Sequence, residues 1–395
     1  MHIDRRSILK TAGGLTVVVV SGGVWRSISN GAFASGTGPA FAPWADWQTG
    51  MNEGPLALVR AAILAASPHN SQPWRFRVFP SRIELHADPA RAVGAPDPFL
   101  REMHLALGCA LENMLVAARV CGYEVDLALA AGQLAAGLPG PAPVVTLRLS
   151  RCPARAEPLA EAISARHTNR GPYDMGRPLS PESLSAIDAL VQDIEGVRLV
   201  VFADPGQRAA FATEVVSAAE AVAGDAVMVA AEEAWFRASW SRVQSLRDGL
   251  TPDTAGMPAI DIAAAKLLPA GNPVARHREG LRRLKEVQLP ASPVFGLIAV
   301  SDLYDLGQSL HAGRAWQRLH LWASTRGIAL QPLNVLLERV DRERFLGREP
   351  EAARRVAGFI GDPGWRPTFA FRGGYPLEPA PPSPRRPVEW VLVKA

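Results

Sequence analysis

Cysteine and histidine are scarce in this chain of 395 residues, and their scarcity excludes two common ways of stabilising a fold. Three cysteines, Cys109, Cys121 and Cys152, are too few for a disulfide framework. Cys109 and Cys121 fall on one expected helix, 12 positions and therefore roughly 18 Å apart, which is beyond bridging distance. Nothing in the sequence decides whether either pairs with Cys152. The histidines are scattered, without a His-x-x-x-His or Cys-x-x-Cys pair, so we expect no structural metal.

Charge is also sparse, and its distribution argues against a nucleic-acid-binding surface. Charged residues make up 20% of the chain and apolar ones 48%, which is typical of a globular protein. The net charge is +4, of which residues 1–34 alone carry +3. The remainder is close to neutral and has no basic stripe with interleaved aromatics, so we expect no nucleic-acid partner. The length suits one large domain or two ordinary ones.

The first 34 residues have the features of an export signal in order. The pair Arg5-Arg6 precedes an apolar stretch over 12–24 and an Ala-x-Ala site that ends at Ala34. About 13 apolar residues are too few to span a bilayer, which takes about 20, but they suit a signal peptide. We therefore predict a twin-arginine signal over 1–34, a linker over 35–54, and a periplasmic or extracytoplasmic protein. Its partner would be the twin-arginine export machinery, with no membrane span in the mature form. The alternatives are a cytosolic helix and an uncleaved anchor.

The most specific local pattern is the loop Ser67-Pro68-His69-Asn70-Ser71-Gln72-Pro73-Trp74. It lies between an expected helix over 56–66 and an expected strand over 76–79. Hydroxyl, imidazole and amide groups supply donors and acceptors, proline fixes the backbone, and the tryptophan closes one side. Such a loop suits a planar polar ligand. The ordinary alternative is a helix-capping loop around a buried tryptophan.

Two apolar helices, expected over 108–122 and 313–327, share one plan at an offset of 205 residues. Each begins and ends at a glycine, has alanines at matching positions, and is followed by a strand-like run. Both are apolar on almost every face, which is typical of a helix buried on all sides. The pattern favours an internal repeat, and chance similarity between two alanine-rich helices is the alternative.

Arginines gather in two later segments. Arg166-His167-Thr168-Asn169-Arg170 precedes a Gly-Pro-Tyr turn, and a second segment over 371–376 contains Arg372. Further on, Arg385-Arg386 precedes an expected last strand over 388–393. Arginine offers two parallel N–H donors and a permanent charge, which suits a phosphate better than the point charge of lysine. The alternatives are a solvated basic turn and an exposed tail.

Together these motifs resemble the nitroreductase family of FMN-dependent oxidoreductases. The loop 67–74 is similar to the family's Pro-Ser-x-x-Asn-x-Gln-Pro-Trp signature, residues 166–170 to its Arg-x-Ser/Thr-x-Arg motif, and residues 371–376 to its penultimate strand. The paired helices resemble the central helix of the family's obligate dimer. The resemblance implies an α+β, nitroreductase-like fold, in which two halves are fused as a single-chain pseudo-dimer around buried central helices, as in the Acg-like branch.

The resemblance also implies one composite FMN site. In family dimers the arginine motif comes from one subunit and the Pro-Ser-x-x-Asn loop from the other. Here the first half, 55–150, has only the loop and the second, 151–395, has only the arginine motif, so we predict one FMN per chain. A cation before the last strand reaches the phosphate in the family, and Arg385 or Arg386 would do so here. The predicted cofactor-binding residues are Ser67, Pro68, His69, Asn70, Gln72, Arg166, His167, Thr168, Arg170, Arg372, Arg385 and Arg386.

The implied activity is reduction of small aromatic or quinone-like acceptors through bound flavin, with NAD(P)H or another small molecule as electron donor. No catalytic residue stands out. Residues 205–300 match no core element of the family, and we predict that they form a lid over the flavin, with a structural insertion elsewhere as the alternative. An exported chain meets little NAD(P)H, so an FMN-sequestering protein without turnover is the second hypothesis. A relic that has lost the cofactor is the third.

Overall fold

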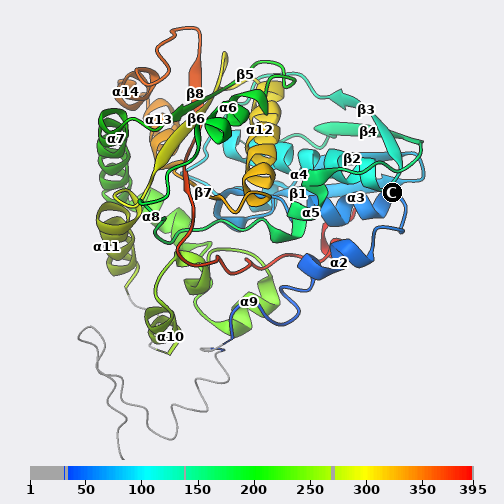
Figure 1. The fold of residues 1–395 in the computed structure, drawn as a ribbon, viewed down its shortest axis with the longest axis horizontal. Coiled ribbons are helices and arrows are strands. Elements are labelled where there is room, and N and C mark those ends of the chain that lie inside the picture. Colours follow the sequence, from blue (N-terminus) through cyan, green and yellow to red (C-terminus); the bar gives the residue numbers. More distant parts are fainter. Residues whose placement is uncertain (1–30, 32–33, 138, 268–271, 394–395) are drawn as a thin grey trace, which may run out of the picture.

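Two four-stranded antiparallel sheets form the framework of the chain (Figure 1). The computed structural model describes residues 31, 34–137, 139–267 and 272–393. The first sheet runs β1-β2-β4-β3 and the second β5-β6-β8-β7, so both follow the order first, second, fourth, third. The strands are β1 (Trp74–Phe79), β2 (Arg82–Ala87), β3 (Tyr123–Leu129), β4 (Val145–Arg151), β5 (Val197–Phe202), β6 (Val294–Val300), β7 (Ala329–Pro332) and β8 (Arg366–Gly374).

In each sheet a long helix links the second strand to the third. Helix α4 (Arg101–Val120) joins β2 to β3, and α12 (Leu306–Ser324) joins β6 to β7. The other α-helices are α2 (Pro43–Thr49), α3 (Pro55–Ala62), α5 (Pro158–Ala165), α6 (Pro181–Ala189), α7 (Pro205–Ala223), α8 (Ala226–Glu233), α9 (Trp240–Leu246), α10 (Ala259–Leu267), α11 (Pro273–Arg283), α13 (Val335–Phe345), α14 (Glu351–Ala357) and α15 (Val388–Val391). Short 3₁₀ turns cover Pro68–Asn70, Pro89–Arg91 and Pro252–Ala255, and a π turn covers Leu284–Gln288.

The two long helices cross at a pair of glycines. A Cβ added to Gly108 would lie 2.1 Å from the carbonyl oxygen of Leu310, and one added to Gly313 would lie 1.9 Å from that of Leu105. The contacts are reciprocal at an offset of 205 residues, so a pseudo-two-fold axis passes between the glycines. The repeated strand order and this crossing confirm two fused halves around central helices.

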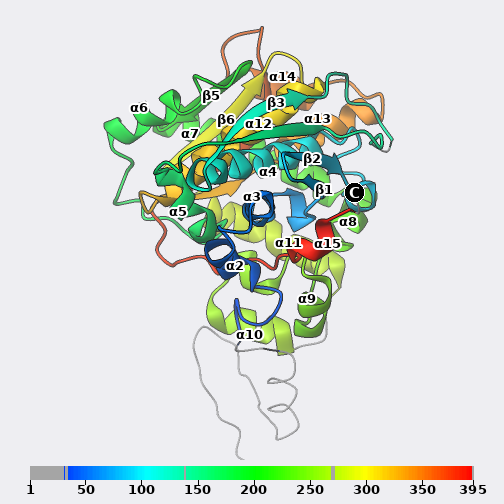
Figure 2. The same ribbon diagram turned by 90° about the vertical axis from the view of Figure 1, so that its right-hand side faces the viewer.

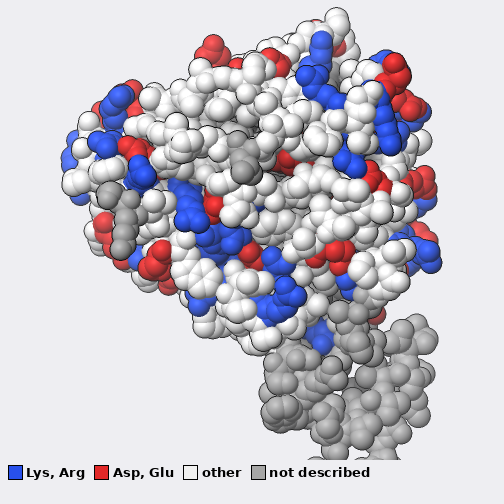
Figure 3. Space-filling model, turned by 180° about the vertical axis from the view of Figure 1, so that it is seen from behind, with Lys and Arg blue, Asp and Glu red and all other residues white. Residues whose placement is uncertain are grey.

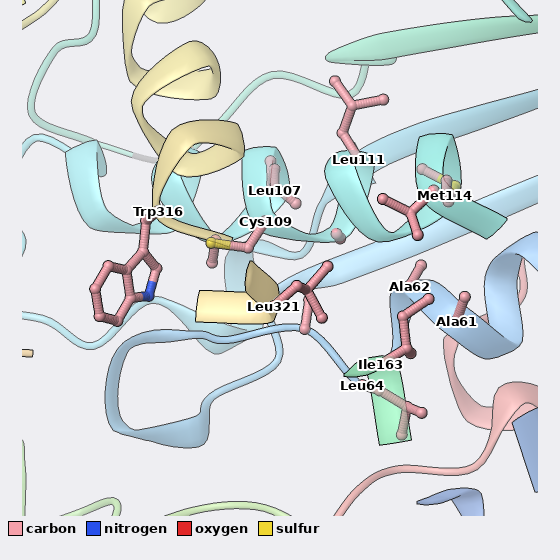
Figure 4. Packing of buried hydrophobic residues seen from close by; sticks show 14 of the residues in the cluster. Ala61, Ala62, Leu64, Leu107, Cys109, Leu111, Met114, Ile163, Trp316 and Leu321 are labelled. Atoms are coloured by element: carbon pink, nitrogen blue, oxygen red, sulfur yellow. The ribbon is translucent and has the colours of Figure 1, made fainter. Parts of the chain in front are cut away.

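The main core forms around the two central helices. Leu107, Leu111 and Met114 of α4 pack near Trp316 and Leu321 of α12, with side chains of α3 and α5 completing the cluster (Figure 4). Helix α4 is the one described helix long and apolar enough to cross a membrane, but 83% of the window that passes the test is buried inside the fold. Its apolar faces are therefore matched by protein contacts, as the sequence pattern predicts.

The second sheet is covered on both faces, whereas the first is covered on one. Every residue of β6 is buried, because the central helices pack on one face and α7, α13 and α14 on the other (Figure 2). Strand β3 instead alternates between more buried and exposed positions, which is typical of a sheet with one face toward solvent. The interval 205–300 is therefore not one unit: α7 and β6 belong to the packed core of the second half.

The predicted last strand over 388–393 is wrong for most of its length. Residues Val388–Val391 form the short helix α15, and only Leu392 makes a parallel bridge, to Phe76 of β1. The segment before it runs from β8 in the second half across to the first half (Figure 1). Its path is fixed by the backbone N–H of Arg385, which donates to the carbonyl of Ala40 at 2.7 Å.

The predicted export signal falls almost entirely outside the described residues.

On the face drawn in Figure 3, patches of basic side chains are interrupted by acidic ones. Cys109, Cys121 and Cys152 are free cysteines. Within the described residues, no group of three or more His, Cys, Asp or Glu side chains is arranged to hold a metal ion.

Candidate functional site: an arginine cluster between the halves

The loop after α3 has an unusual backbone that its own side chains support. His69, Asn70 and Gln72 have φ angles of 49°, 54° and 54°, in the left-handed region that residues other than glycine seldom adopt. The Ser67 hydroxyl accepts a hydrogen bond from the backbone N–H of Gln72 at 3.1 Å. Strained conformations of this kind persist where the surrounding structure holds them, and they concentrate at functional sites.

The side-chain amides of Asn70 and Gln72 connect this loop by hydrogen bonds to residues 384–386, in the C-terminal segment, and to residues 247–249. Asn70 accepts a hydrogen bond from Arg385 Nη1 at 2.7 Å and donates to the carbonyls of Pro384 and Gly249, at 3.0 and 3.2 Å. Gln72 donates to the carbonyl of Arg247 at 2.8 Å and accepts from the backbone N–H of Arg386, also at 2.8 Å. The amides therefore orient neighbouring cations rather than point at open space.

Arg166 and Arg385 meet on one carbonyl oxygen. Arg166 Nη2 donates to Leu64 O at 2.9 Å, and Arg385 Nη2 donates to the same atom at 3.3 Å. Both guanidinium groups face the indole ring of Trp44, with Arg385 4.6 Å and Arg166 5.9 Å from a ring centroid. The ring of His167 meets the same indole edge-on at 4.5 Å. We call Arg166, Arg385, His167 and Trp44 the arginine cluster.

The arginine cluster carries buried positive charge without a matching carboxylate. The side chains of Arg166 and Arg385 are each 2% exposed. Neither makes a salt bridge within the described part of the chain; their donors go to backbone carbonyls, Asn70, Ser383 and His320. A buried charge without an opposite charge is costly, and binding an anion would offset that cost.

The electrostatic consequences are consistent with an excess of cations. Burial, followed by the charges of Arg166 and Arg385, lowers the pKa of His167 to about 3. Burial, followed by the charge of Arg170, lowers the pKa of His69 to about 4. Burial also lowers the pKa of Arg166 to about 10, so its guanidinium stays charged at neutral pH. At neutral pH the site therefore combines the charged guanidinium group of Arg166 with neutral histidines, and burial, followed by the charge of Arg166, lowers the pKa of Arg385 as well.

Arg170 and Arg372 lie in a neighbouring group. Arg170 donates from Nη1 to the carbonyl of Thr254 at 3.0 Å. Arg372 is fully buried, lies 4.2 Å from the Tyr173 ring centroid, and donates to Gln331 Oε1 at 2.7 Å and to Gly171 O at 2.6 Å. Arg372 therefore fixes the turn that follows Arg170. Neither arginine makes a salt bridge among the described residues.

The two adjacent C-terminal arginines point to different surroundings. Arg385 belongs to the arginine cluster, whereas Arg386 lies 3.8 Å from the carboxylate of Asp88 and donates to the carbonyls of Gln72 and Trp390, at 3.3 and 2.9 Å. Arg386 is therefore partly compensated. Of the remaining predicted residues, Pro68 opens the short 3₁₀ turn, and Thr168 is half-buried without a side-chain hydrogen bond to any described residue.

Sequence reasoning missed three residues that support the site. Trp44, from α2, provides the aromatic face of the arginine cluster. His320 of α12 contacts Arg166 Nη1 through Nδ1 at 3.3 Å, and Gln317 of the same helix accepts from the backbone N–H of Ala66 at 3.2 Å. His320 and Gln317 were visible as polar residues inside an apolar helix, but that signal does not say which loop they meet.

Several buried polar atoms of the site have no partner among the residues that the structure describes. Nε of Arg166 and of Arg385, and Nδ1 of His69 and of His167, have no hydrogen-bond partner among the described residues. Unpaired buried polar atoms are uncommon and costly in folded proteins, so those in one place indicate a ligand. Guanidinium donors suit a phosphate group, and imidazole nitrogens, which donate or accept according to the tautomer, suit a polar heterocycle, so this set fits FMN.

Residues 247–256, which we call the lid segment, contact several residues of this site. The backbone N–H of Gly249 donates to Asn70 O at 3.2 Å, and Thr254 O accepts from Arg170. A Cβ added to Gly256 would lie 2.3 Å from the backbone of Arg170, so the segment is tightly packed there. The lid segment thus touches both the loop of the first half and the arginine motif of the second.

No protein-family model matches the chain. Its sequence is 27% identical over 348 residues to a protein named "Putative NAD(P)H nitroreductase" from Mycobacterium tuberculosis H37Rv, covering 84% of this chain and 88% of that one. The protein of the same description from strain CDC 1551 / Oshkosh matches with the same figures.

Two solved nitroreductase structures give weaker likenesses. The FMN-dependent nitroreductase NfnB from Mycobacterium smegmatis, in complex with NADPH, is 15% identical and aligns with a TM-score of 0.38, covering 60% of this chain and 98% of that one. A nitroreductase with bound FMN from Desulfitobacterium hafniense is 14% identical with a TM-score of 0.36, covering 61% and 100%.

Proposed function

We propose that the chain binds one FMN at the arginine cluster and is an oxidoreductase of the nitroreductase type. The observation that carries this proposal is the pair Arg166 and Arg385, two buried guanidinium groups without a carboxylate partner, beside the strained loop at Asn70. Similarity over most of the chain to proteins named as NAD(P)H nitroreductases supports it.

In this proposal the residues divide into contacts and supports. Arg166, Arg385 and Arg170 would hold the phosphate and the polar edge of the flavin, because they offer charged donors without carboxylate partners. Asn70 and Gln72 would position these cations, since their amides are already bound to the C-terminal segment and the lid segment. When bound, FMN supplies the electron-transfer chemistry, and the protein supplies binding, orientation and exclusion of water.

The fused halves extend the proposal to the family's architecture. We propose that the chain is a pseudo-dimer of the Acg-like kind, in which the site between two subunits has become a site between two halves. The hydrogen bond between Asn70 of the first half and Arg385 of the second supports this reading. Small aromatic or quinone-like molecules would be the electron acceptors.

A second function is favoured by the lid segment. Its contacts with Asn70 and Arg170 support a lid that would close over the site and restrict access of a nicotinamide. The alternative is therefore an exported protein that binds or sequesters FMN without NAD(P)H turnover.

An anaerobic absorbance titration distinguishes the two functions. Purified, FMN-loaded protein is mixed with NADPH or NADH and then with a nitroaromatic or a quinone. Bleaching of the flavin band by the nicotinamide, and its return with the acceptor, is the result expected of the oxidoreductase. A flavin band that survives both nicotinamides but is bleached by dithionite indicates the closed binder. Protein that does not take up FMN contradicts both.

We also propose export by the twin-arginine route. The order of arginine pair, apolar stretch and Ala-x-Ala site supports it. Replacing both Arg5 and Arg6 by lysine should leave the protein in the cytoplasm, as measured by cell fractionation with the unaltered chain as control. Equal periplasmic yields of the two forms would contradict the proposal.

A further inference from the structure

The pseudo-two-fold axis predicts a second position equivalent to the arginine cluster. At the offset of 205, Gln317 and His320 of α12 correspond to Glu112 and Leu115 of α4. The relation extends to the helices beside them. Asn113 of α4 donates to the carbonyl of Ala61 in α3 at 2.8 Å, and its counterpart Arg318 donates to the carbonyl of Leu190 just after α6 at 3.1 Å. The pseudo-two-fold axis therefore relates α3 to α6 and α4 to α12. The space between α6 and α4 is the counterpart of the space between α3 and α12.

A cavity of about 530 Å³ lies at this second position, and we call it the mate cavity. Its walls come from the C-terminal half of α4, the start of β3, residues 152–159, the end of α6, and two arginines of α12. Leu115, Val116, Val125, Leu159 and Leu190 give it an apolar side. A volume of this size is within the range of small-molecule sites.

The mate cavity does not suit FMN, because the charges around it are compensated. Glu112 is 2% exposed and accepts from Arg318 Nε at 2.6 Å and from Arg314 Nε at 2.9 Å. Arg119 is paired with Glu157. Residues 50–54, which follow α2 as the arginine motif follows α5, contain Glu53 and no arginine. A phosphate would find no free cluster of guanidinium groups there.

Two polar groups of the mate cavity nevertheless lack partners. Tyr123 is 4% exposed, and its hydroxyl has no hydrogen-bond partner among the described residues. Arg155 lines the cavity with an exposed side chain for which the described residues provide no carboxylate. A buried hydroxyl without a partner is costly, so a bound acceptor would offset that cost.

We propose that the mate cavity binds a small monocarboxylate with an apolar body. The carboxylate would be held by Arg155 and the Tyr123 hydroxyl, and the body would cover the leucine and valine side. Arg155 is the one lining guanidinium group without an ion pair among the described residues, and Glu124 is the one lining carboxylate without one, so the ligand's carboxylate would lie toward Arg155 and away from Glu124. The apolar side separates such a ligand from a phosphate or a sugar, which would leave polar groups against leucine.

Benzoate is the probe, and benzyl alcohol is the matched uncharged probe. Isothermal titration of the full chain, with FMN added in excess to fill the arginine cluster, should show saturable binding of benzoate and at least about tenfold weaker binding of benzyl alcohol. Arg155→Gln should weaken benzoate binding about tenfold, and Leu115→Trp, which fills the cavity, should abolish it. Arg278→Gln, at an exposed arginine of α11, is the control and should change nothing.

Three results would overturn the proposal. Absence of saturable benzoate binding in the FMN-loaded chain removes the site. Binding unaffected by both Arg155→Gln and Leu115→Trp places the ligand elsewhere. Benzoate binding that appears only without FMN assigns the ligand to the arginine cluster. Tyr123→Phe separates binding from folding, because it removes one oxygen and should weaken benzoate binding while the melting temperature of the free protein stays the same or rises.

Discussion

The arginine cluster and the mate cavity occupy equivalent positions on the two sides of the pseudo-two-fold axis. They differ in whether their arginines are paired with carboxylates. In the arginine cluster, two guanidinium groups are buried and donate to neutral groups. In the mate cavity, Glu112, Asp193 and Glu157 neutralise three arginines. The frameworks agree, so the ligand preference is decided by a few side chains, above all by whether position 112 or its counterpart 317 carries a charge.

The difference in charge pairing has opposite effects on local stability and on anion binding. A carboxylate paired with two arginines is electrostatically satisfied, whereas a cation against carbonyl oxygens keeps part of its desolvation cost. The arginine cluster is thus less stable on its own and more receptive to an anion. We therefore expect the local stability of the FMN-free protein to be lowest around the arginine cluster.

The largest effect is expected where the two sides meet. Gly313→Ala places a methyl group 1.9 Å from Leu105 O, and Gly108→Ala places one 2.1 Å from Leu310 O. Both helices must move apart, so each substitution should lower the free energy of unfolding by about 3 kcal/mol or more. Urea denaturation measures this, with Gly280→Ala, at an exposed helical glycine with open space, as control. A large loss in only one of the two variants would contradict a symmetric crossing.

The next largest effect is on FMN affinity. Arg166→Ala should weaken FMN binding by about 10- to 100-fold, because a charged hydrogen bond to a buried ligand contributes about 1.5–3 kcal/mol. Asn70→Ala should act in the same direction by freeing Arg385. The matched substitution Arg314→Ala, in the mate cavity, should leave FMN affinity unchanged. Fluorescence quenching of FMN measures all three, and equal losses at Arg166 and Arg314 would contradict the assignment.

Exchanging one residue between the sides sharpens the comparison. Gln317→Glu introduces into the arginine-cluster side the carboxylate that the mate cavity has at position 112. The added charge should compete with the phosphate and weaken FMN binding about tenfold, an effect that salt reduces. Glu112→Gln is the reciprocal change and should leave FMN binding intact. Tighter FMN binding in Gln317→Glu would contradict the charge argument.

A separate effect is expected on the pH dependence of stability. Burial lowers the pKa of His167 to about 3 and of His69 to about 4, whereas in the unfolded chain both titrate near 6.5. The unfolded state therefore gains protons first, and stability present above about pH 6.5 is lost as the pH falls toward 4. His167→Gln should remove about 2 kcal/mol of this loss at pH 5. Denaturation at pH 5 and 7 measures it, and an unchanged pH slope would count against a buried neutral imidazole.

Sequence patterns predicted the elements that depend on local or periodic signals. The offset of 205 between Gly108 and Gly313 predicted the internal repeat, but both glycines were expected at the starts of their helices. That they lie inside α4 and α12 and form the crossing comes from the structure alone. The Ser-Pro-His-Asn loop and the Arg166 motif were placed side by side by the resemblance alone. Periodicity could not say that Arg385 enters the arginine cluster whereas Arg386 is buried beside Asp88, since that depends on the path of the segment that joins the halves.

Three features depended on contacts that no local pattern contains. Residues 388–393 have strand-forming valines, but a proline before them and the edge of β1 leave a single helical turn. Trp44 lies in a segment predicted as linker, and its burial follows from the C-terminal segment that crosses it. The mate cavity required the fold, because its walls come from segments separated by up to about 200 residues.

The ratio of FMN to protein tests the central claim most directly. After saturation with FMN and removal of the excess, the flavin absorbance per chain should correspond to one bound FMN, and Arg166→Ala combined with Arg385→Ala should reduce it toward zero. A ratio of two, or a ratio of one that survives the double substitution, would contradict a single flavin site at the arginine cluster.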